Sequence, residues 1–142
     1  MAAVETALVL CFVVLPIVFG IISYGYMLTF RQSLSQAATE GARAAAVKAV
    51  NGTLAQRQVM QTTAAQGAVN EAVGTFSSSM QCGQAYLTCD ISFHSCPDVS
   101  PSGCVEVKVS YPYRDHSLLP TVPGLGVLLP SNLVYSAVAG VN

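Results

Sequence analysis

The feature that most constrains this chain is an uncharged, apolar run from Thr6 to Phe30, which lies between Glu5 and Arg31. At 1.5 Å per residue, a helix over these 25 residues would be about 38 Å long, enough to cross a hydrocarbon core of about 30 Å with some tilt. A secretory signal peptide would instead have a basic start, a shorter apolar stretch and a small-x-small cleavage site, in that order. The sequence therefore predicts a membrane-spanning helix.

Length and charge limit what the rest of the chain can be. The 142 residues suffice for one modest domain plus an extended element. The net charge is −1 without any basic cluster, so we expect no nucleic-acid partner. His94 and His116 occur among cysteines but without C-x-x-C spacing, and neither a nucleophile elbow nor a phosphate-binding glycine loop is present. We therefore expect no enzyme, no cofactor or metal, and no small-molecule substrate.

The cysteines indicate which side of the membrane the C-terminal part occupies. Four of the five recur at intervals of seven, seven and eight positions: Cys82, Cys89, Cys96 and Cys104. An even set of this kind in a small domain predicts two disulfides and an oxidising, extracytoplasmic compartment. The N-terminus would then start on the cytoplasmic side, yet no Lys or Arg precedes the apolar run while Arg31 follows it, the reverse of the positive-inside rule. We therefore expect that a basic leader once preceded Met1 and was removed.

The pattern beyond residue 50 predicts an α+β head. We divide the chain into an N-terminal transmembrane helix at 1–50 and an extracytoplasmic head at 51–142. Thr53 and Gln56 form a T-x-x-Q capping box, which predicts a second helix over 53–80. A disulfide-tied, antiparallel β-sheet is expected over 85–140.

Alternation of side chains defines the strands of that sheet. "AYLTCDISFH" and "CVEVKVSYPY" both alternate with period two and flank the turn-rich "SCPDVSPSGC", which predicts a hairpin. Cys96–Cys104 is the natural bridge across its mouth, leaving Cys82–Cys89 as the second, although four cysteines allow three connectivities. "LVYSAVAG" should return as a third strand.

Several features of the helices suggest how they pack. Small residues recur every fourth position after the apolar run, at Ala37, Gly41, Ala45 and Ala49. This row forms either a close-packed seam, between subunits or against the second helix, or simply a stretch of high helix propensity. Pro16 removes a helical hydrogen bond and predicts a bend. Tyr24, Tyr26 and Phe30 fall where an interfacial aromatic belt would lie. Asn51-Gly52-Thr53 matches a glycosylation acceptor, although turn chemistry already explains these residues.

Both ends of the chain resemble a known family. "AAVETALVL", "LPIVFGIISYGYMLTF" and "RQSLSQAATEGARAAA", with "VEVKVSYPYRDHSLLP" and "NLVYSAVAGV" near the C-terminus, are similar to TadE-like pilins and pseudopilins of the tight-adherence branch of type IV pilus systems. The resemblance implies that a prepilin peptidase removes a short basic leader after a Gly, and that a Glu stands at the fifth mature position. With Met1 as the first mature residue, Glu5 takes that place, although the leader and its Gly do not occur in this sequence.

For Glu5 two interpretations stand. A carboxylate in mid-bilayer costs about 2.5–3.5 kcal/mol, so in a helical bundle it could pair with the α-ammonium of Met1 of a neighbouring copy and thereby set the register of assembly. Alternatively, it sits in the first turn, where the helix dipole favours an acid, and reaches the interface. The resemblance favours the pairing.

The resemblance implies a homo-oligomeric, helical filament that serves surface adhesion and whose core is formed by the helix at 1–50. The prepilin peptidase and the pilus assembly machinery would be further partners. The protein would reside in the inner or cytoplasmic membrane before assembly and in an extracellular filament afterwards. A minor pseudopilin, an anchored accessory protein that primes pilus assembly or secretion, is the alternative. Major pilins of this type are usually much shorter than this chain, which is an argument for the minor role, but the structural subunit stays the first interpretation.

Overall fold

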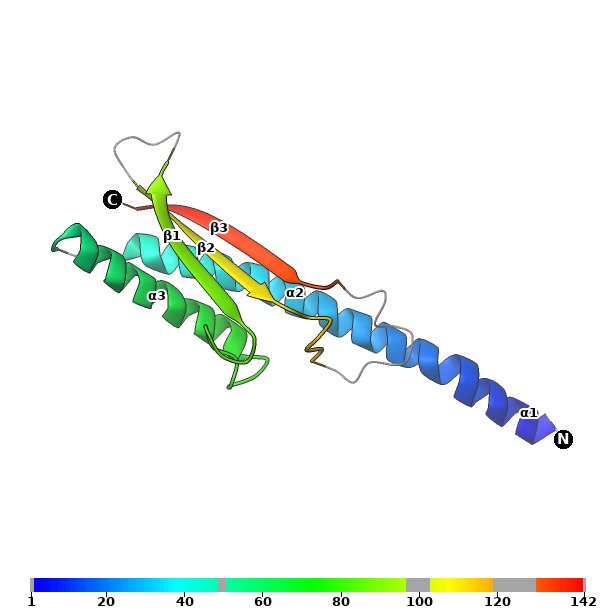
Figure 1. Ribbon diagram of the computed structural model, residues 1–142. Coiled ribbons are helices and arrows are strands. Elements are labelled where there is room, and N and C mark those ends of the chain that lie inside the picture. The colour runs from blue at the N-terminus through cyan, green and yellow to red at the C-terminus, as the bar shows by residue number, and fades with distance from the viewer. Residues whose placement is uncertain (1, 49–50, 97–102, 119–129, 142) are drawn as a thin grey trace.

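The computed structural model describes residues 2–48, 51–96, 103–118 and 130–141, which form three α-helices, one π-helical turn and three strands (Figure 1). In chain order these are α1 (Ala2–Val9), η1 (Leu10–Val14), α2 (Leu15–Val47), α3 (Leu54–Gly74), β1 (Thr88–Ser95), β2 (Gly103–Tyr111) and β3 (Leu133–Val141). The α+β class predicted from the sequence is confirmed, with a long apolar N-terminal helix, a second helix and an antiparallel sheet.

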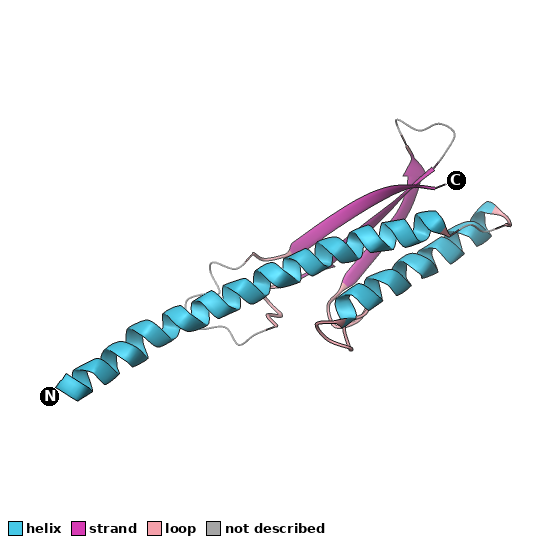
Figure 2. Ribbon diagram, turned by 180° about the vertical axis from the view of Figure 1, so that it is seen from behind, coloured by secondary structure: helices cyan, strands magenta, loops and turns pink. Residues whose placement is uncertain are grey.

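The first three elements form one continuous rod. α1, η1 and α2 follow one another without a break, and the N-terminal half of this rod projects away from the rest of the molecule (Figures 1 and 2). The C-terminal half of α2 packs beside α3, and every fully buried α2 residue lies between Met27 and Ala45. The predicted helix and head segments therefore share one hydrophobic core.

The sheet has the order β1-β2-β3, and both pairings are antiparallel. Ile91, Val107 and Ala137 stand opposite one another across the three strands. Val105, Val107 and Val109 of the central strand are fully buried, whereas the alternate residues point to the other face. Both long helices cover the first face (Figures 1 and 2). The period-two pattern of the sequence therefore predicted correctly which face of the strands is buried.

The second helix begins as predicted but ends earlier. At its start, Gln56 N–H donates to Thr53 Oγ1 and Thr53 N–H donates to Gln56 Oε1, which completes the capping box. The helix ends at Gly74 rather than continuing to Met80. Directly after it, the Thr75 hydroxyl donates to the Ala72 carbonyl and Met80 N–H donates to the Ser77 carbonyl, so local turns replace the helical ladder.

Two disulfides hold the two ends of β1. Cys82–Cys89 joins the segment after α3 to β1, and Cys96–Cys104 joins the end of β1 to β2. Cys82 N–H also donates to Asn70 Oδ1 at 2.7 Å, which fixes the first disulfide loop to α3. Of the three connectivities that the sequence allowed, this is the one formed.

Candidate assembly site

The N-terminal half of the rod exposes a long apolar surface. In its most apolar stretch of 18 residues no residue is buried. The helix is long and apolar enough to cross a membrane. Side chains on all sides of it are exposed, including Val4, Leu8, Phe12, Ile17 and Ile21. A helix that is apolar all round needs an apolar environment, either lipid or other helices. This surface is therefore the part of the molecule that requires a partner.

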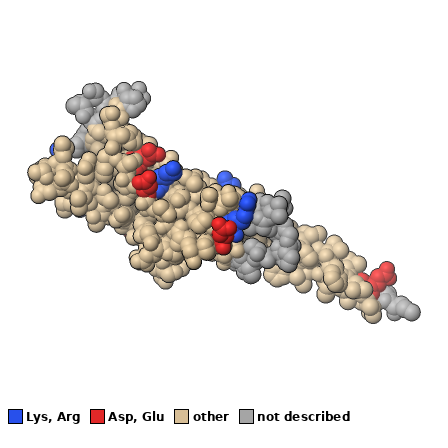
Figure 3. All heavy atoms as spheres, viewed as in Figure 1, with Lys and Arg blue, Asp and Glu red and all other residues tan. Residues whose placement is uncertain are grey.

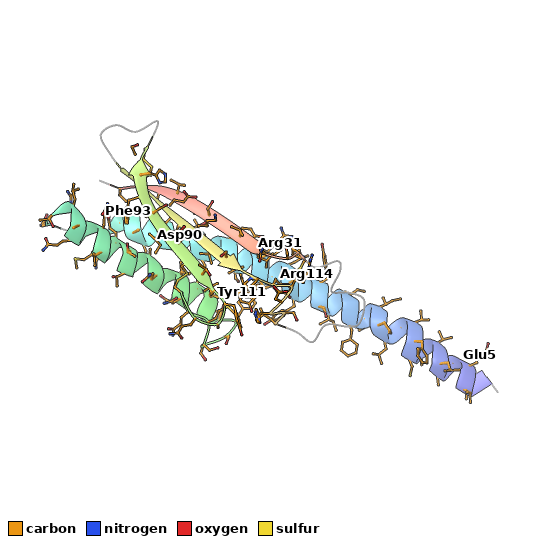
Figure 4. All side chains as sticks on the ribbon, in the orientation of Figure 1. Glu5, Arg31, Asp90, Phe93, Tyr111 and Arg114 are labelled. Carbon is orange, nitrogen blue, oxygen red and sulfur yellow. A yellow bond between two sulfur atoms is a disulfide. The ribbon has the colours of Figure 1, made fainter. Side chains whose placement is uncertain are left out.

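Glu5 lies near the far end of this apolar rod. A long uncharged surface separates it from the charged residues of the head (Figures 3 and 4). Within the described part of the chain, Glu5 is exposed and no hydrogen bond or ion pair involves it. Met1, the predicted charge partner, lies outside the described residues. The carboxylate is thus placed where it is available to a neighbouring molecule.

Pro16 follows directly after the π-helical turn. Leu15 N–H donates to the Leu10 carbonyl, a bond one residue longer than in an α-helix, and α2 then starts with Pro16 in its first turn. A single π-helical turn is a common way to accommodate an irregularity within a long helix. The ribbon continues through this point in both views (Figures 1 and 2), and the bend at Pro16 stays a prediction.

An aromatic cluster packs α2 against the head, next to the point where the exposed N-terminal half of the rod begins. The Phe30 side chain is fully buried, and its ring meets Phe76 edge-on at 5.3 Å and Tyr111 edge-on at 5.2 Å between centroids. Tyr113 lies 6.0 Å from the Phe30 ring, and Tyr26 meets Phe76 edge-on at 5.8 Å. Such pairs add to the free energy of burial. The cluster therefore couples the head to the orientation of the helix.

Burial in this cluster changes the acidity of two phenols. It raises the pKa of Tyr111 and of Tyr113 above the usual tyrosine value, with smaller contributions from neighbouring tyrosines. The Tyr111 hydroxyl donates to the His116 carbonyl at 2.8 Å, which ties the end of β2 to the following turn. Burial in the cluster therefore favours the neutral, protonated form of both phenols.

A second connection between rod and head lies at Arg31, the first charged residue after the apolar run. Its Nε donates to the Tyr135 hydroxyl on β3 at 2.7 Å (Figure 4). The two residues are 104 positions apart in the sequence. The C-terminal strand is thereby attached to the helix at the level where the helix leaves the head.

The row of small residues packs within the molecule. Ala37, Gly41 and Ala45 are buried, and a Cβ placed on Gly41 would come within 2.7 Å of Val69 Cγ2 and 3.2 Å of Val107 Cγ1. Of the seams considered from the sequence, the described residues therefore form the one against the second helix, together with the sheet. Ala49 lies outside the described residues.

The remaining predicted positions lie on the surface of the head. Asn51 is exposed in the connection between α2 and α3, and the hydroxyl of Thr53 is engaged in the capping box. In the loop closed by Cys82–Cys89, Tyr86 has a φ of 66°. Its ring stacks on the ring of His116, with 3.3 Å between the ring centroids. Among the described residues, no group of three or more His, Cys, Asp and Glu side chains is placed to hold a metal ion.

Some of these contacts had no signal in the sequence. Tyr24, Tyr26 and Phe30 fit an interfacial belt by their position in the sequence, but of the three only Tyr24 is exposed. Phe30 is buried in the core, and Tyr26 is half-buried against Phe76. The "YPY" motif shows two aromatic residues without showing that they meet Phe30. These partners become visible only when the strands are placed on α2.

Comparison with known proteins gives one match. The model of a family described as TadE-like protein matches residues 1–43. The match confirms the resemblance to this family for α1, η1 and most of α2, and it ends before α3, the sheet and both disulfides. No curated protein and no solved structure matches the chain.

Proposed function

We propose that this protein is a structural subunit of an extracellular, type IV-like tight-adherence pilus, which assembles through its N-terminal helix and serves surface adhesion. The observation that carries the proposal is the unburied apolar rod, because it coincides with the segment that matches the TadE-like family. Before assembly the rod spans the cytoplasmic membrane, and in the filament the rods of other copies replace the lipid.

Glu5 has a defined role in this proposal. It pairs with the α-ammonium of a neighbouring copy in an apolar environment, where an unpaired carboxylate is costly. Only a copy in the correct axial position satisfies that charge, so the pairing selects the register of addition. The exposure of Glu5 and its distance from the basic residues of the head support this role.

The proposal includes partners and a location. A prepilin peptidase removes a basic leader, and the pilus assembly machinery extracts the subunit from the membrane. The head then lies outside the cell, where two disulfides stabilise it. This role is structural rather than catalytic and needs no cofactor.

A minor pseudopilin that primes assembly or secretion is the second candidate. The observation that favours it is the size of the head, which adds a helix, a sheet and two disulfides beyond the segment matched by the family model. A low-copy subunit at the filament tip, or one kept in the membrane, could use the same helix.

Immunogold electron microscopy of sheared surface material distinguishes the two roles. Antibody against the head should label filaments along their length if the protein is the structural subunit. Label at filament tips alone, or in the membrane alone, would overturn that role in favour of the accessory one. N-terminal sequencing of the protein from the same material should start at Met1, because any other start moves Glu5 from the fifth position.

A further inference from the structure

The last strand of the sheet has an unusually unprotected edge. Among the described residues, β3 pairs with β2 alone, so the backbone groups along its other edge have no strand partner. Such edges usually carry a charge, a proline or a bulge that prevents pairing with another chain. β3 contains no charged residue and no proline, and its nine residues extend over about 30 Å. Only Leu133 is buried along the strand. This edge can therefore accept a further strand.

The opposite edge of the sheet is formed by β1, whose one carboxylate, Asp90, is exposed on the outer face beside Lys108 of β2 rather than along the edge. β1 and β3 are each antiparallel to β2, so they run in the same direction as each other. Both start at the membrane-proximal end of the head and run away from the N-terminus, as α2 does (Figure 1). All copies anchored in one membrane, or packed in one polar filament, share this direction. A β-strand from a second copy would therefore meet β3 in parallel.

We propose that β3 of one copy pairs in parallel with β1 of the next copy, so that the sheets join side by side. This inference rests on the proposed function, since it requires copies that assemble with one polarity. Each copy then uses both of its free edges, and the helices of successive copies stay on the same face of the joined sheet. A contact of this head-to-tail kind closes into a ring or continues as a helical filament.

Strand direction and the side of the sheet that the helices cover favour this pair of edges. In the pairing of β3 with β1, both edges take part and the helices of both copies stay on one face of the joined sheet. A contact between two β3 strands would instead bring Arg31 of both copies to the same edge, put the helices on opposite faces and leave β1 unpaired.

Cysteine cross-linking in living cells tests the pairing. In a Cys11→Ser background, one copy carries Ser136→Cys and a co-expressed copy carries Thr88→Cys, Asp90→Cys, Ser92→Cys or His94→Cys. These side chains are exposed on the outer face of the two edge strands. We expect one of the four combinations to form a covalent dimer in high yield on a non-reducing gel. Lys108→Cys is the matched control, because it lies on the same face of the central strand and should not cross-link to Ser136→Cys.

The outcomes separate this inference from the proposed function. Filaments without a dimer from any β1 position, or with equal dimer formation by Ser136→Cys alone, would overturn the edge pairing and leave the pilus role intact. Dimers between β1 and β3 in cells that form no filaments would support the pairing and contradict the pilus role. If neither dimers nor filaments form, both are overturned.

Discussion

Gly41 lies where α2 packs closely against both α3 and the sheet. It lies on α2 opposite Val69 of α3 and Val107 of β2, so helix, helix and sheet meet at one point. A methyl group there would approach Val69 Cγ2 to 2.7 Å and the Ala65 carbonyl to 3.4 Å. Because Val69 and Val107 are fully buried, β-branched side chains with little freedom to rotate away, α2 would have to move from α3 and β2 to make room. Glycine is thus required here for close approach rather than for its backbone freedom.

Gly41→Ala should therefore destabilise the head. We expect a loss of about 1–3 kcal/mol in the free energy of unfolding, from overpacking of a core that cannot relax. The measurement is thermal and denaturant unfolding of the full chain in detergent. Gly67→Ala is the control, because a Cβ at this exposed position in α3 meets no atom within 4 Å and should stabilise the helix by about 0.5–1 kcal/mol. Equal effects of the two substitutions would contradict the packing.

The raised pKa values of Tyr111 and Tyr113 predict that the head becomes less stable at alkaline pH. Burial raises the pKa of both phenols in the folded state, so the folded chain favours the neutral form more than the unfolded chain does. This contribution is fully present below about pH 10, the unfolded value, and falls as pH rises through the raised folded values. Tyrosinate absorbance should show a late phase that coincides with loss of near-ultraviolet circular dichroism.

Replacing both buried tyrosines by phenylalanine should remove that late phase. Tyr24→Phe should retain it, because Tyr24 is exposed and outside the aromatic cluster. A late phase that persists in the Tyr111→Phe, Tyr113→Phe variant would show that other groups titrate there.

At the scale of elements, local pattern predicted most of the fold. The alternation around Val105, Val107 and Val109 predicted the central strand and its buried face, because a strand with one covered face needs period two. Thr53 and Gln56 predicted the start of α3 for an equally local reason, since the capping box lies within one turn. The apolar run predicted the rod from its length and composition alone.

Local sequence patterns could not predict the contacts between elements. Phe30 has the aromatic side chain and the sequence position of a membrane-interface residue. Only its contacts with Phe76 and Tyr111 show that it belongs to the core. The bond between Arg31 and Tyr135 joins residues 104 positions apart, which no local period can indicate. Gly41 was visible as one of a row of small residues, but its partner, the second helix rather than another subunit, required the fold.

The Cys82–Cys89 disulfide stabilises a short element whose backbone is otherwise unusual. Within its loop Ala85 and Tyr86 both have positive φ, a conformation that is costly for residues other than glycine. We expect the double variant Cys82→Ser, Cys89→Ser to unfold with a free energy lower by about 2–3 kcal/mol, the loop-closure contribution of a short disulfide. Chemical denaturation in detergent measures it.

Cys11 provides the control for that prediction. It is exposed on the apolar rod and forms no disulfide among the described residues. Cys11→Ser should leave the free energy of unfolding unchanged. If the double variant unfolded at the same denaturant concentration as Cys11→Ser, the disulfide would not stabilise the head.

As a whole, the molecule has two parts with opposite requirements. The C-terminal half of α2 shares one core with α3 and the sheet, closed by an aromatic cluster and two disulfides, whereas the N-terminal half of the rod has an apolar surface that the described residues leave unburied. The aromatic cluster and the bond between Arg31 and Tyr135 hold the two parts in a fixed relation. Copies whose rods pack together would therefore also present their heads in a regular array. Such an array is what the proposed filament requires.

The central claim is that the rods assemble with Glu5 as the group that sets their register. Removing the carboxylate lowers the cost of placing the helix in a membrane, so Glu5→Ala should be found in the membrane at the wild-type level. The measurement is a count of filaments in sheared surface material by electron microscopy, normalised to membrane-bound protein. The account predicts few or no filaments for Glu5→Ala and wild-type numbers for Val4→Ala, an exposed apolar neighbour. Abundant filaments from Glu5→Ala would contradict it.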